Sequence, residues 1–261
     1  ASGMGFAVVS DARAAALSPA VRECAIASFK AQGVESVVVL GGDGTMLDAA
    51  HTLAGQRLPM MGLNIGSLGY LTSVEEHQFG DALQQLREDR YDVSLRTALA
   101  VTVSHREGAR VALPDALNDA VISRGASGRV VELELLLDDH PVSTFLCDGI
   151  IVATPTGSTA YSLSAGGPIL LPDTQALVVS MICPHSLTSR PLVVKDSTRI
   201  TLRAVDCDSP MIVSSDGRDN EPLNLEDRVE ISRSPHNVPV IELRGYNPCD
   251  VLRRKLCWGG R

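Results

Sequence analysis

A glycine-rich pentapeptide near the start of the chain combines the residue types needed to bind a phosphate group and to move a proton. The sequence GGDGT at residues 41–45 follows the apolar run 37–40, and a helix is expected directly after it. Glycines let the backbone approach a ligand closely, and the free N–H groups of a helix start attract phosphate. The residues of this phosphate turn are Gly41, Gly42, Gly44 and Thr45.

The acidic residue inside this turn needs an explanation of its own. A carboxylate beside phosphates is repelled unless it holds a metal or meets a proton, so we interpret Asp43 as the group that takes or orients a hydroxyl proton. A plainer alternative is that Asp43 only caps the helix that follows. The first interpretation predicts a phosphoryl-transfer site and the second predicts only a tight turn.

Two further segments could supply the polar contacts of a nucleotide site. The loop NIGSLGYLT at residues 64–72 follows the next expected strand, so it should lie at the same edge of the sheet as the phosphate turn. The segment TPTGSTAYSLSAGGP at residues 154–168 places hydroxyls, glycines and a tyrosine behind a buried strand. It could be an irregular loop without a ligand, but a long ordered loop in a compact domain usually has a function. We therefore predict that it supplies hydrogen bonds to a dinucleotide.

These segments, together with the dipeptide Asn118-Asp119, resemble the motifs of the NAD kinase family in matching order. The resemblance covers roughly residue 37 to the C-terminus, and the block 154–168 is its most specific part. The family moves the γ-phosphoryl group of ATP, or in some members of inorganic polyphosphate, onto the 2′-hydroxyl of the adenosine ribose of NAD. The resemblance therefore implies a phosphotransferase that makes NADP.

The resemblance also implies roles for individual residues. Asp43 would accept the proton of the 2′-hydroxyl, while Asn118 and Asp119 would hold the ribose and diphosphate end of NAD. Asp148 and the run 159–164 would hold its adenine and nicotinamide parts, and Arg129 falls where the family often places a basic contact. The predicted NAD-binding residues are Asp43, Gly44, Asn118, Asp119, Arg129, Asp148, Thr159, Ala160, Tyr161, Ser162, Leu163, Ser164 and Arg218.

The sequence departs from the family pattern in two places. Many members have Gln where Arg218 stands, so we expect that substrate contact to be altered. The usual first strand and its turn ahead of Ser10 are missing or degenerate, so a complete site for the nucleotide donor cannot be derived from residues 6–11.

The elements that must position these residues change in character near residue 91. Before it, apolar runs alternate with helical segments in the βαβ pattern of a doubly wound, Rossmann-like parallel sheet. After it, short runs between turn residues, some alternating with period two, predict a β-rich structure. We predict an α/β domain at 1–92, a β-rich NAD-binding domain at 93–246, and a helix within 247–261 that packs back on the first domain. The expected strands of the first domain are 6–9, 37–40 and 58–63, and its expected helices are 18–33, 45–54 and 79–88.

Composition excludes several other classes of protein. The formal net charge of −8 disfavours a nucleic-acid partner. The uncharged stretch 149–172 is too rich in Gly, Pro, Ser and Thr to cross a membrane, and no signal peptide is recognisable. The six cysteines form no C-x-x-C pair, which favours reduced thiols and a cytoplasmic protein. No motif predicts a metal held by protein ligands alone, so Mg²⁺ or another divalent cation should arrive with the phosphoryl donor.

Two alternatives to an NAD kinase remain at this point. A lipid kinase of the diacylglycerol or sphingosine type shares the GGDGT turn, but it would need an apolar groove in place of the hydroxyl-rich block. A non-catalytic NAD(H) sensor would keep the dinucleotide site, but it has no use for Asp43. The family resemblance further implies a homodimer or homotetramer.

Overall fold

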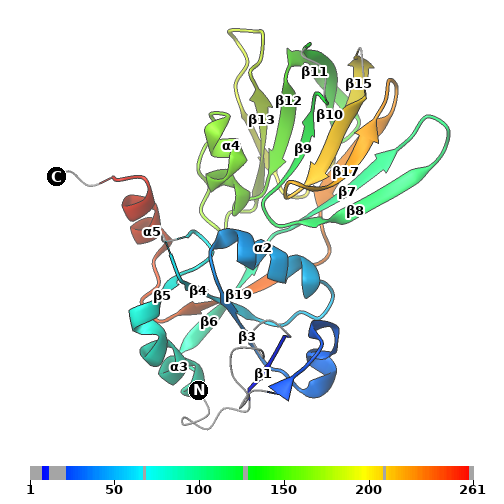
Figure 1. The fold of residues 1–261 in the computed structure, drawn as a ribbon. Coiled ribbons are helices and arrows are strands. Elements are labelled where there is room, and N and C mark those ends of the chain that lie inside the picture. The colour runs from blue at the N-terminus through cyan, green and yellow to red at the C-terminus, as the bar shows by residue number, and fades with distance from the viewer. Residues whose placement is uncertain (1–7, 12–21, 67–68, 126–128, 208–209, 259–261) are drawn as a thin grey trace. The chain divides into compact units, whose positions relative to one another are not determined.

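The chain divides into two compact units, shown here by a computed structural model that describes residues 8–11, 22–66, 69–125, 129–207 and 210–258 (Figure 1). Unit 1 comprises Ala1–Leu95 and Val238–Arg261, and unit 2 comprises Arg96–Asn237. The predicted boundaries differ from these units in two respects. The first unit continues past residue 92 to Leu95, and it takes in residues 238–246 from the segment that we placed in the β-rich domain.

A mixed sheet forms the centre of unit 1 and explains these boundaries. Its strand order is β3-β4-β19-β6, and a short β5 also pairs with β4. Strands β3, β5 and β19 each run parallel to β4. Because β6 and β19 complete this sheet, residues 91–95 and 238–243 belong to unit 1. The strands are β3 (Val37–Leu40), β4 (Met60–Asn64), β5 (Val74–Glu75), β6 (Tyr91–Arg96) and β19 (Val238–Leu243).

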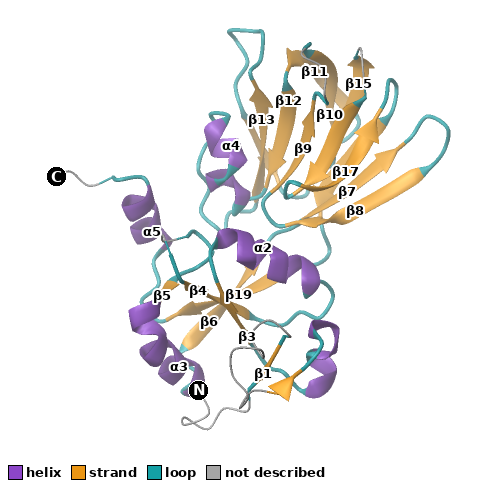
Figure 2. Cartoon of the chain, viewed as in Figure 1, coloured by secondary structure: helices purple, strands orange, loops and turns teal. Residues whose placement is uncertain are grey.

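Helices α2 (Asp43–Thr52), α3 (Phe79–Arg87) and α5 (Pro248–Lys255) complete the main elements of unit 1 (Figure 2). Parallel β3 and β4 with α2 between them form a βαβ unit, which confirms the predicted α/β fold. All five residues of β4 are buried, since it has a neighbour on both sides. Strand β3 is less buried than predicted, with Leu40 47% exposed, because it lies at the edge of the sheet.

The N-terminal part of unit 1 differs from the prediction. Strands β1 (Val9–Ser10) and β2 (Arg22–Glu23) form a separate parallel pair. In place of the second half of a helix at 18–33, the chain forms two 3₁₀ turns, Ile26–Ser28 and Lys30–Gln32. They end at Gly33, whose φ of 75° is the left-handed conformation that a glycine adopts without strain. Residues 12–21, where the helix should begin, lie outside the described part.

Unit 2 contains two six-stranded sheets whose pairings are antiparallel, which confirms the predicted β-rich half. The strand orders are β11-β10-β15-β18-β7-β8 and β14-β13-β12-β9-β16-β17. Alternation in β10 buries Val131, Leu133 and Leu135 in the core and leaves the glutamates between them partly exposed. The first sheet contains β7 (Leu99–Ser104), β8 (Arg110–Ala116), β10 (Val131–Leu137), β11 (His140–Cys147), β15 (Ile200–Asp206) and β18 (Arg228–Arg233). The second contains β9 (Asp119–Ser123), β12 (Gly149–Ala153), β13 (Ala176–Ile182), β14 (Leu192–Lys195), β16 (Met211–Ser215) and β17 (Arg218–Leu223).

Three adjacent strands of the second sheet position the candidate site residues of unit 2. Strand β9 lies between β12 and β16, so the segments at their ends can contact each other. A 3₁₀ turn (Gly157–Thr159) and the one-turn helix α4 (Tyr161–Ser164) connect β12 to β13. Among the described residues, no helix is both long and apolar enough to span a membrane.

Candidate active site

The carboxylate of Asp43 joins the two glycine-containing loops of unit 1. Strands β3 and β4 pair in parallel with Leu40 opposite Leu63, so the loops that follow them share one edge of the sheet, as predicted. The backbone N–H of Tyr70 donates to Asp43 Oδ2 at 2.8 Å, and the N–H of Leu71 donates to Oδ1 at 2.9 Å. The capping position of α2 is Gly42, and Asp43 is the first helical residue. Asp43 therefore anchors the second loop instead of capping its own helix.

Two glycines are required for this close approach. A Cβ on Gly69 would lie 2.0 Å from Asp43 Oδ1, and a Cβ on Gly41, where φ is 156°, would lie 2.3 Å from Thr45 Oγ1. Either substitution would push the neighbouring side chain away. Gly42 and Gly44 are different, because no described atom lies within 4 Å of the Cβ that each would carry. The surface of the phosphate turn is therefore open at these two residues.

Helix α5 supports the loop that Asp43 anchors. The Lys255 ammonium lies 5.3 Å from the centre of the Tyr70 ring, and Arg254 forms an ion pair with Glu75 at 2.5 Å. Burial, and next the negative charge of Asp43, raise the pKa of the Tyr70 hydroxyl. The helix thus packs back within unit 1, where its basic residues contact the loop region and do not merely face solvent.

The dipeptide Asn118-Asp119 lies at the junction of β8 and β9 in unit 2, where a carboxylate holds its backbone. Asp216 accepts hydrogen bonds from the backbone N–H groups of Leu117 at 2.8 Å, Asn118 at 2.7 Å and Asp119 at 3.1 Å. The N–H of Asp216 donates in return to the carbonyl of Asp119 at 2.9 Å. No sequence motif had assigned a role to Asp216. The only local signal was its place in an Asp-Gly turn.

The start of the hydroxyl-rich block packs against the same turn. The Thr154 hydroxyl donates to the carbonyl of Leu117 at 2.6 Å and accepts the N–H of Gly157 at 3.0 Å. The N–H of Thr154 donates to the carbonyl of Asn118 at 2.9 Å, and a Cβ on Gly157 would lie only 1.9 Å from that same oxygen. Residues 117–119, 154–157 and 216 therefore form one hydrogen-bonded cluster in unit 2.

The carboxyl group of Asp119 is less acidic within this cluster than an ordinary aspartate. The residue is only 5% exposed. Burial, and next the negative charge of Asp216, raise the pKa of Asp119 to about 7. Asp119 can therefore carry a proton near neutral pH, and a protonated carboxyl both donates and accepts hydrogen bonds.

Most hydroxyls of the block 154–168 form hydrogen bonds within the fold. The Ser158 hydroxyl bonds to the carbonyl of Pro155 and the backbone of Leu170. The Ser162 hydroxyl is fully buried and lies 3.0 Å from that of Ser180. A continuous β12–turn–β13 connection needs these bonds, because a buried loop must satisfy its own backbone. Tyr161 and Ser164 are exposed, while Thr159, Ala160 and Leu163 are partly buried.

Of the remaining predicted residues, Arg218 begins β17 directly after the Asp216-Gly217 turn and so lies beside the cluster, whereas Asp148 and Arg129 lie elsewhere in unit 2. Asp148 precedes β12 and forms an ion pair with Arg124 at 3.2 Å. It therefore lies at the opposite end of β12 from Thr154, about 20 Å away at the usual rise of a strand. Arg129 and Arg218 are both exposed. One copy of the chain thus does not bring Asp148 together with the Asn118-Asp119 turn.

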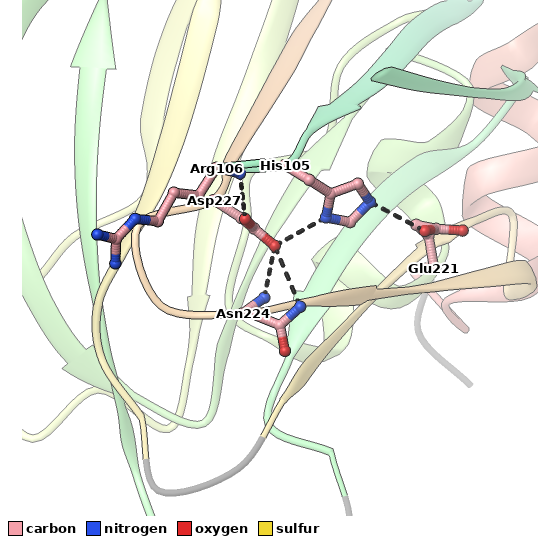
Figure 3. A network of polar contacts seen from close by, with 5 residues as sticks. All are labelled: His105, Arg106, Glu221, Asn224 and Asp227. Carbon is pink, nitrogen blue, oxygen red and sulfur yellow. Dashed lines mark hydrogen bonds and ion pairs between the residues drawn. The ribbon is translucent and has the colours of Figure 1, made fainter. Parts of the chain in front are cut away.

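A second polar network in unit 2 involves no predicted site residue (Figure 3). The His105 ring contacts Asp227 through Nδ1 at 2.8 Å and Glu221 through Nε2 at 3.1 Å. Asp227 also accepts the backbone N–H groups of Arg106 and Asn224, each at 2.8 Å. The hydrogen bond to Asp227 raises the pKa of His105, although partial burial acts in the opposite direction.

An α/β unit with a carboxylate at a glycine-rich turn, in a chain with a β-rich unit that holds a buried polar cluster, is the combination expected of a nucleotide-dependent phosphotransferase. Comparison with known proteins identifies which one: the chain belongs to the NAD kinase family. Residues 10–91 match the ATP-NAD kinase N-terminal domain, and residues 117–243 match the ATP-NAD kinase C-terminal domain. The predicted fold class and the predicted family are thereby confirmed.

Individual relatives agree with this assignment. The chain is 41% identical over 227 residues to an NAD kinase of Geobacter metallireducens, covering 87% of this chain and 80% of the relative. It is 38% identical over 259 residues to an NAD kinase of Acidobacterium capsulatum, covering 99% and 90%.

Solved structures share the fold. A yeast NADH kinase in complex with NADH has a TM-score of 0.80 at 26% identity, covering 87% of this chain and 68% of that one. An NAD kinase from Archaeoglobus fulgidus has a TM-score of 0.76 at 24% identity, covering 97% and 98%. Membership of this family assigns the protein to the phosphotransferases and argues against the lipid-kinase and sensor alternatives.

Proposed function

We propose that the protein transfers the γ-phosphoryl group of ATP to the 2′-hydroxyl of the adenosine ribose of NAD and so forms NADP. The observation that carries this proposal is the carboxylate of Asp43, held at the phosphate turn by two backbone N–H groups. The description of the matching family as ATP-NAD kinases supports ATP as the donor.

Asp43 acts as the general base in this proposal. A carboxylate has about four lone-pair positions, and the N–H groups of Tyr70 and Leu71 use one on each oxygen. Lone pairs therefore remain to accept the hydroxyl proton. The 2′-oxygen forms a bond to the γ-phosphorus, the bond from that phosphorus to the β-phosphate oxygen breaks, and ADP leaves with the electron pair. The two anchoring bonds fix the carboxylate in place, which general-base catalysis requires.

The other predicted residues bind and orient the substrates. The open phosphate turn at Gly42 and Gly44 would receive the donor phosphates, and Asn118 and Asp119 would bind the ribose of NAD. Phosphoryl transfer needs little more from the protein than positioning and stabilisation of charge. We propose that Mg²⁺ enters bound to ATP, as part of the substrate, because ATP phosphates are the usual carriers of this ion into a kinase site.

The direct test is incubation of the protein with NAD, ATP and Mg²⁺, followed by detection of NADP. Parallel reactions replace ATP with polyphosphate, replace NAD with NADH, or omit Mg²⁺. NADP formation that depends on ATP and Mg²⁺ is the expected result. Binding of NAD without NADP formation from either donor would contradict the proposal. Use of NADH is a separate outcome, suggested by the yeast NADH kinase that shares this fold.

The position of Asp148 supports the prediction of a homodimer or homotetramer. In a single copy, Asp148 and Asn118 lie near opposite ends of the paired strands β12 and β9. We propose that a second copy supplies one of them to each dinucleotide. Light scattering coupled to size-exclusion chromatography tests this, and a monomer at the concentration of the assay would contradict it.

A further inference from the structure

The turn at residues 117–119 receives unusually complete support from one side chain. Asp216 Oδ1 accepts the N–H groups of Asn118 and Asp119, and Oδ2 accepts that of Leu117. Three consecutive backbone N–H groups thus point at one carboxylate. Hydrogen bonds to an ionised acceptor are roughly twice as strong as neutral ones, so the turn has little freedom to change its conformation.

We propose that Asp216 is a positioning residue for NAD: its carboxylate fixes the backbone of residues 117–119 so that the side chains of Asn118 and Asp119 are in place before NAD binds. This inference rests on the proposed function of those two residues. Asp216 itself does not touch the substrate in this proposal. It acts through the turn, and it lowers the cost of ordering the turn when the dinucleotide binds.

The left-handed backbone conformation of Asp216 limits the residue types that could replace it in this turn. Its φ is 50°, and the next residue, Gly217, has a φ of 72°. Asp is among the few residues other than glycine that tolerate this left-handed region. In this conformation the N–H of Asp216 reaches the carbonyl of Asp119 while its side chain reaches the three N–H groups. Both the backbone and the side chain of Asp216 thus hold the same turn.

The placement of Asp119 beside Asp216 also has an electrostatic cost, which a turn with a purely structural role could avoid. Asp119 is almost fully buried beside the Asp216 carboxylate, so burial and then the neighbouring charge disfavour its ionised form. A turn that only joined two strands could avoid this cost with an apolar residue at position 119. The cost is consistent with the proposed role of Asp119 in binding NAD, for which Asp216 would hold it in position.

Asp138 provides a matched control in the same unit. It has a φ of 48° in the turn between β10 and β11, its side chain accepts the N–H of Arg199 at 2.9 Å, and its own N–H donates to the Arg199 carbonyl at 2.9 Å. Asn also tolerates left-handed backbone, so neither Asp216→Asn nor Asp138→Asn strains the chain. The amide oxygen of Asn at 138 can keep its single bond. At 216 the amide NH₂ would face an N–H group, so at least one of the three bonds is lost.

The experiment compares steady-state kinetics of Asp216→Asn and Asp138→Asn, with thermal unfolding of each. We expect Asp216→Asn to raise the KM for NAD by about tenfold or more, while the KM for ATP changes by less than about twofold. Asp138→Asn should leave both constants within about twofold of the wild type. An unchanged KM for NAD in folded Asp216→Asn, or equal effects of the two variants, would overturn the proposal. So would a parallel rise in both constants.

A measurement on the wild-type protein covers the case in which Asp216→Asn does not fold. The amides of residues 117–119 should exchange with D₂O as slowly in the absence of NAD as the amides of strand β9. Exchange at the rate of an unstructured loop would mean that the turn is not preformed, and would overturn the proposal. If the wild type binds NAD but makes no NADP, the proposed function fails, while calorimetric NAD titration of both variants still tests the role of Asp216.

Discussion

Two aspartates, one in each unit, hold a neighbouring loop by accepting its backbone N–H groups, but they do so in different settings. Asp43 stands at the start of α2, is partly exposed and receives one N–H on each oxygen. Asp216 stands in a left-handed hairpin turn and receives three N–H groups. The Asp43 carboxylate therefore keeps lone pairs that could accept a proton. The Asp216 carboxylate uses most of its lone pairs to support the backbone of the turn.

The number of N–H groups on a carboxylate therefore helps to separate a reacting residue from a positioning one. Each further N–H stabilises the charged form and occupies a lone pair that a substrate proton would need. Asp227 extends the comparison, since it accepts two backbone N–H groups and a histidine in a network that contains no predicted site residue.

Removal of the reacting carboxylate should have the strongest consequence. Asp43→Asn should lower kcat for NADP formation by about 10² to 10⁴, the usual contribution of a general base. NAD affinity should change by less than about tenfold, or about 1.4 kcal/mol, because the turn proposed to hold NAD lies in unit 2. Steady-state NADP production and calorimetric NAD binding measure the two quantities.

The amide NH₂ introduced by Asp43→Asn would also face the N–H of Tyr70 or Leu71, so thermal unfolding should accompany the assay. Turnover near that of the wild type would remove Asp43 from the catalytic role. Loss of binding and turnover together would instead make it a residue that only shapes the site, which is the role proposed for Asp216.

The next effect concerns the buried carboxyl beside Asp216. The pKa of Asp119 rises from 3.8 to about 7 on folding, so between these values the folded state binds more protons than the unfolded state and stability falls as pH rises. Asp119→Asn removes this penalty. The variant should match the wild type near pH 4 and be more stable at pH 8, by at most about 4 kcal/mol. Urea unfolding of both proteins at the two pH values tests this, and an equal difference at both would contradict it.

A smaller effect is expected when the substrate contact is removed and the turn is left intact. Asn118→Ala should weaken NAD binding by about 1 to 3 kcal/mol, the cost of leaving a buried polar partner unsatisfied. Its backbone N–H still bonds to Asp216, so amide exchange in the turn should stay slow. Isothermal titration that gives an unchanged affinity in the folded variant would refute the assignment.

Arg218 follows the Asp216-Gly217 turn. Its substitution tests whether this hairpin also contributes a positive charge to ligand binding. A guanidinium favours an anionic group such as a pyrophosphate or the new 2′-phosphate of the product, whereas Gln is neutral. Arg218→Gln should weaken NADP binding by about three- to tenfold and NAD binding by less, at an unchanged kcat. Equal shifts for both ligands, or no shift, would count against this role.

The smallest effect is expected on the stability that the network around Asp227 provides. The pKa of His105 is raised by its hydrogen bond to Asp227, so the stabilisation that it provides is complete below about pH 6.5 and is lost as pH rises through the folded-state pKa. His105→Gln should therefore cost about 0.5 to 1 kcal/mol more at pH 5.5 than at pH 9. Unfolding curves at these two pH values measure the difference, and NAD kinetics should not change.

The fold class and half of the candidate site could be predicted because they depend on local patterns. A strand followed by Gly-Gly-Asp-Gly-Thr and a helix places Asp43 at the carboxyl edge of a parallel sheet, and parallel strands bring the next loop to the same edge. The hydroxyl-rich block connects β12 to β13, but the hydrogen bonds that its hydroxyls form within the fold were not predicted. Whether Ser162 faces a ligand or Ser180 depends on how the connection packs against β13.

The two kinds of architecture and the chemistry of the phosphate turn follow from local patterns in the sequence, and the family follows from the resemblance of its motifs to those of NAD kinases. Three other features required the folded molecule: β19 completes the first sheet, Asp216 holds a turn 99 positions earlier in the chain, and the pKa of Asp119 is raised to about 7. These features arise from strand order and register, which bring distant residues together, and from the burial that follows. No local pattern of residues specifies them.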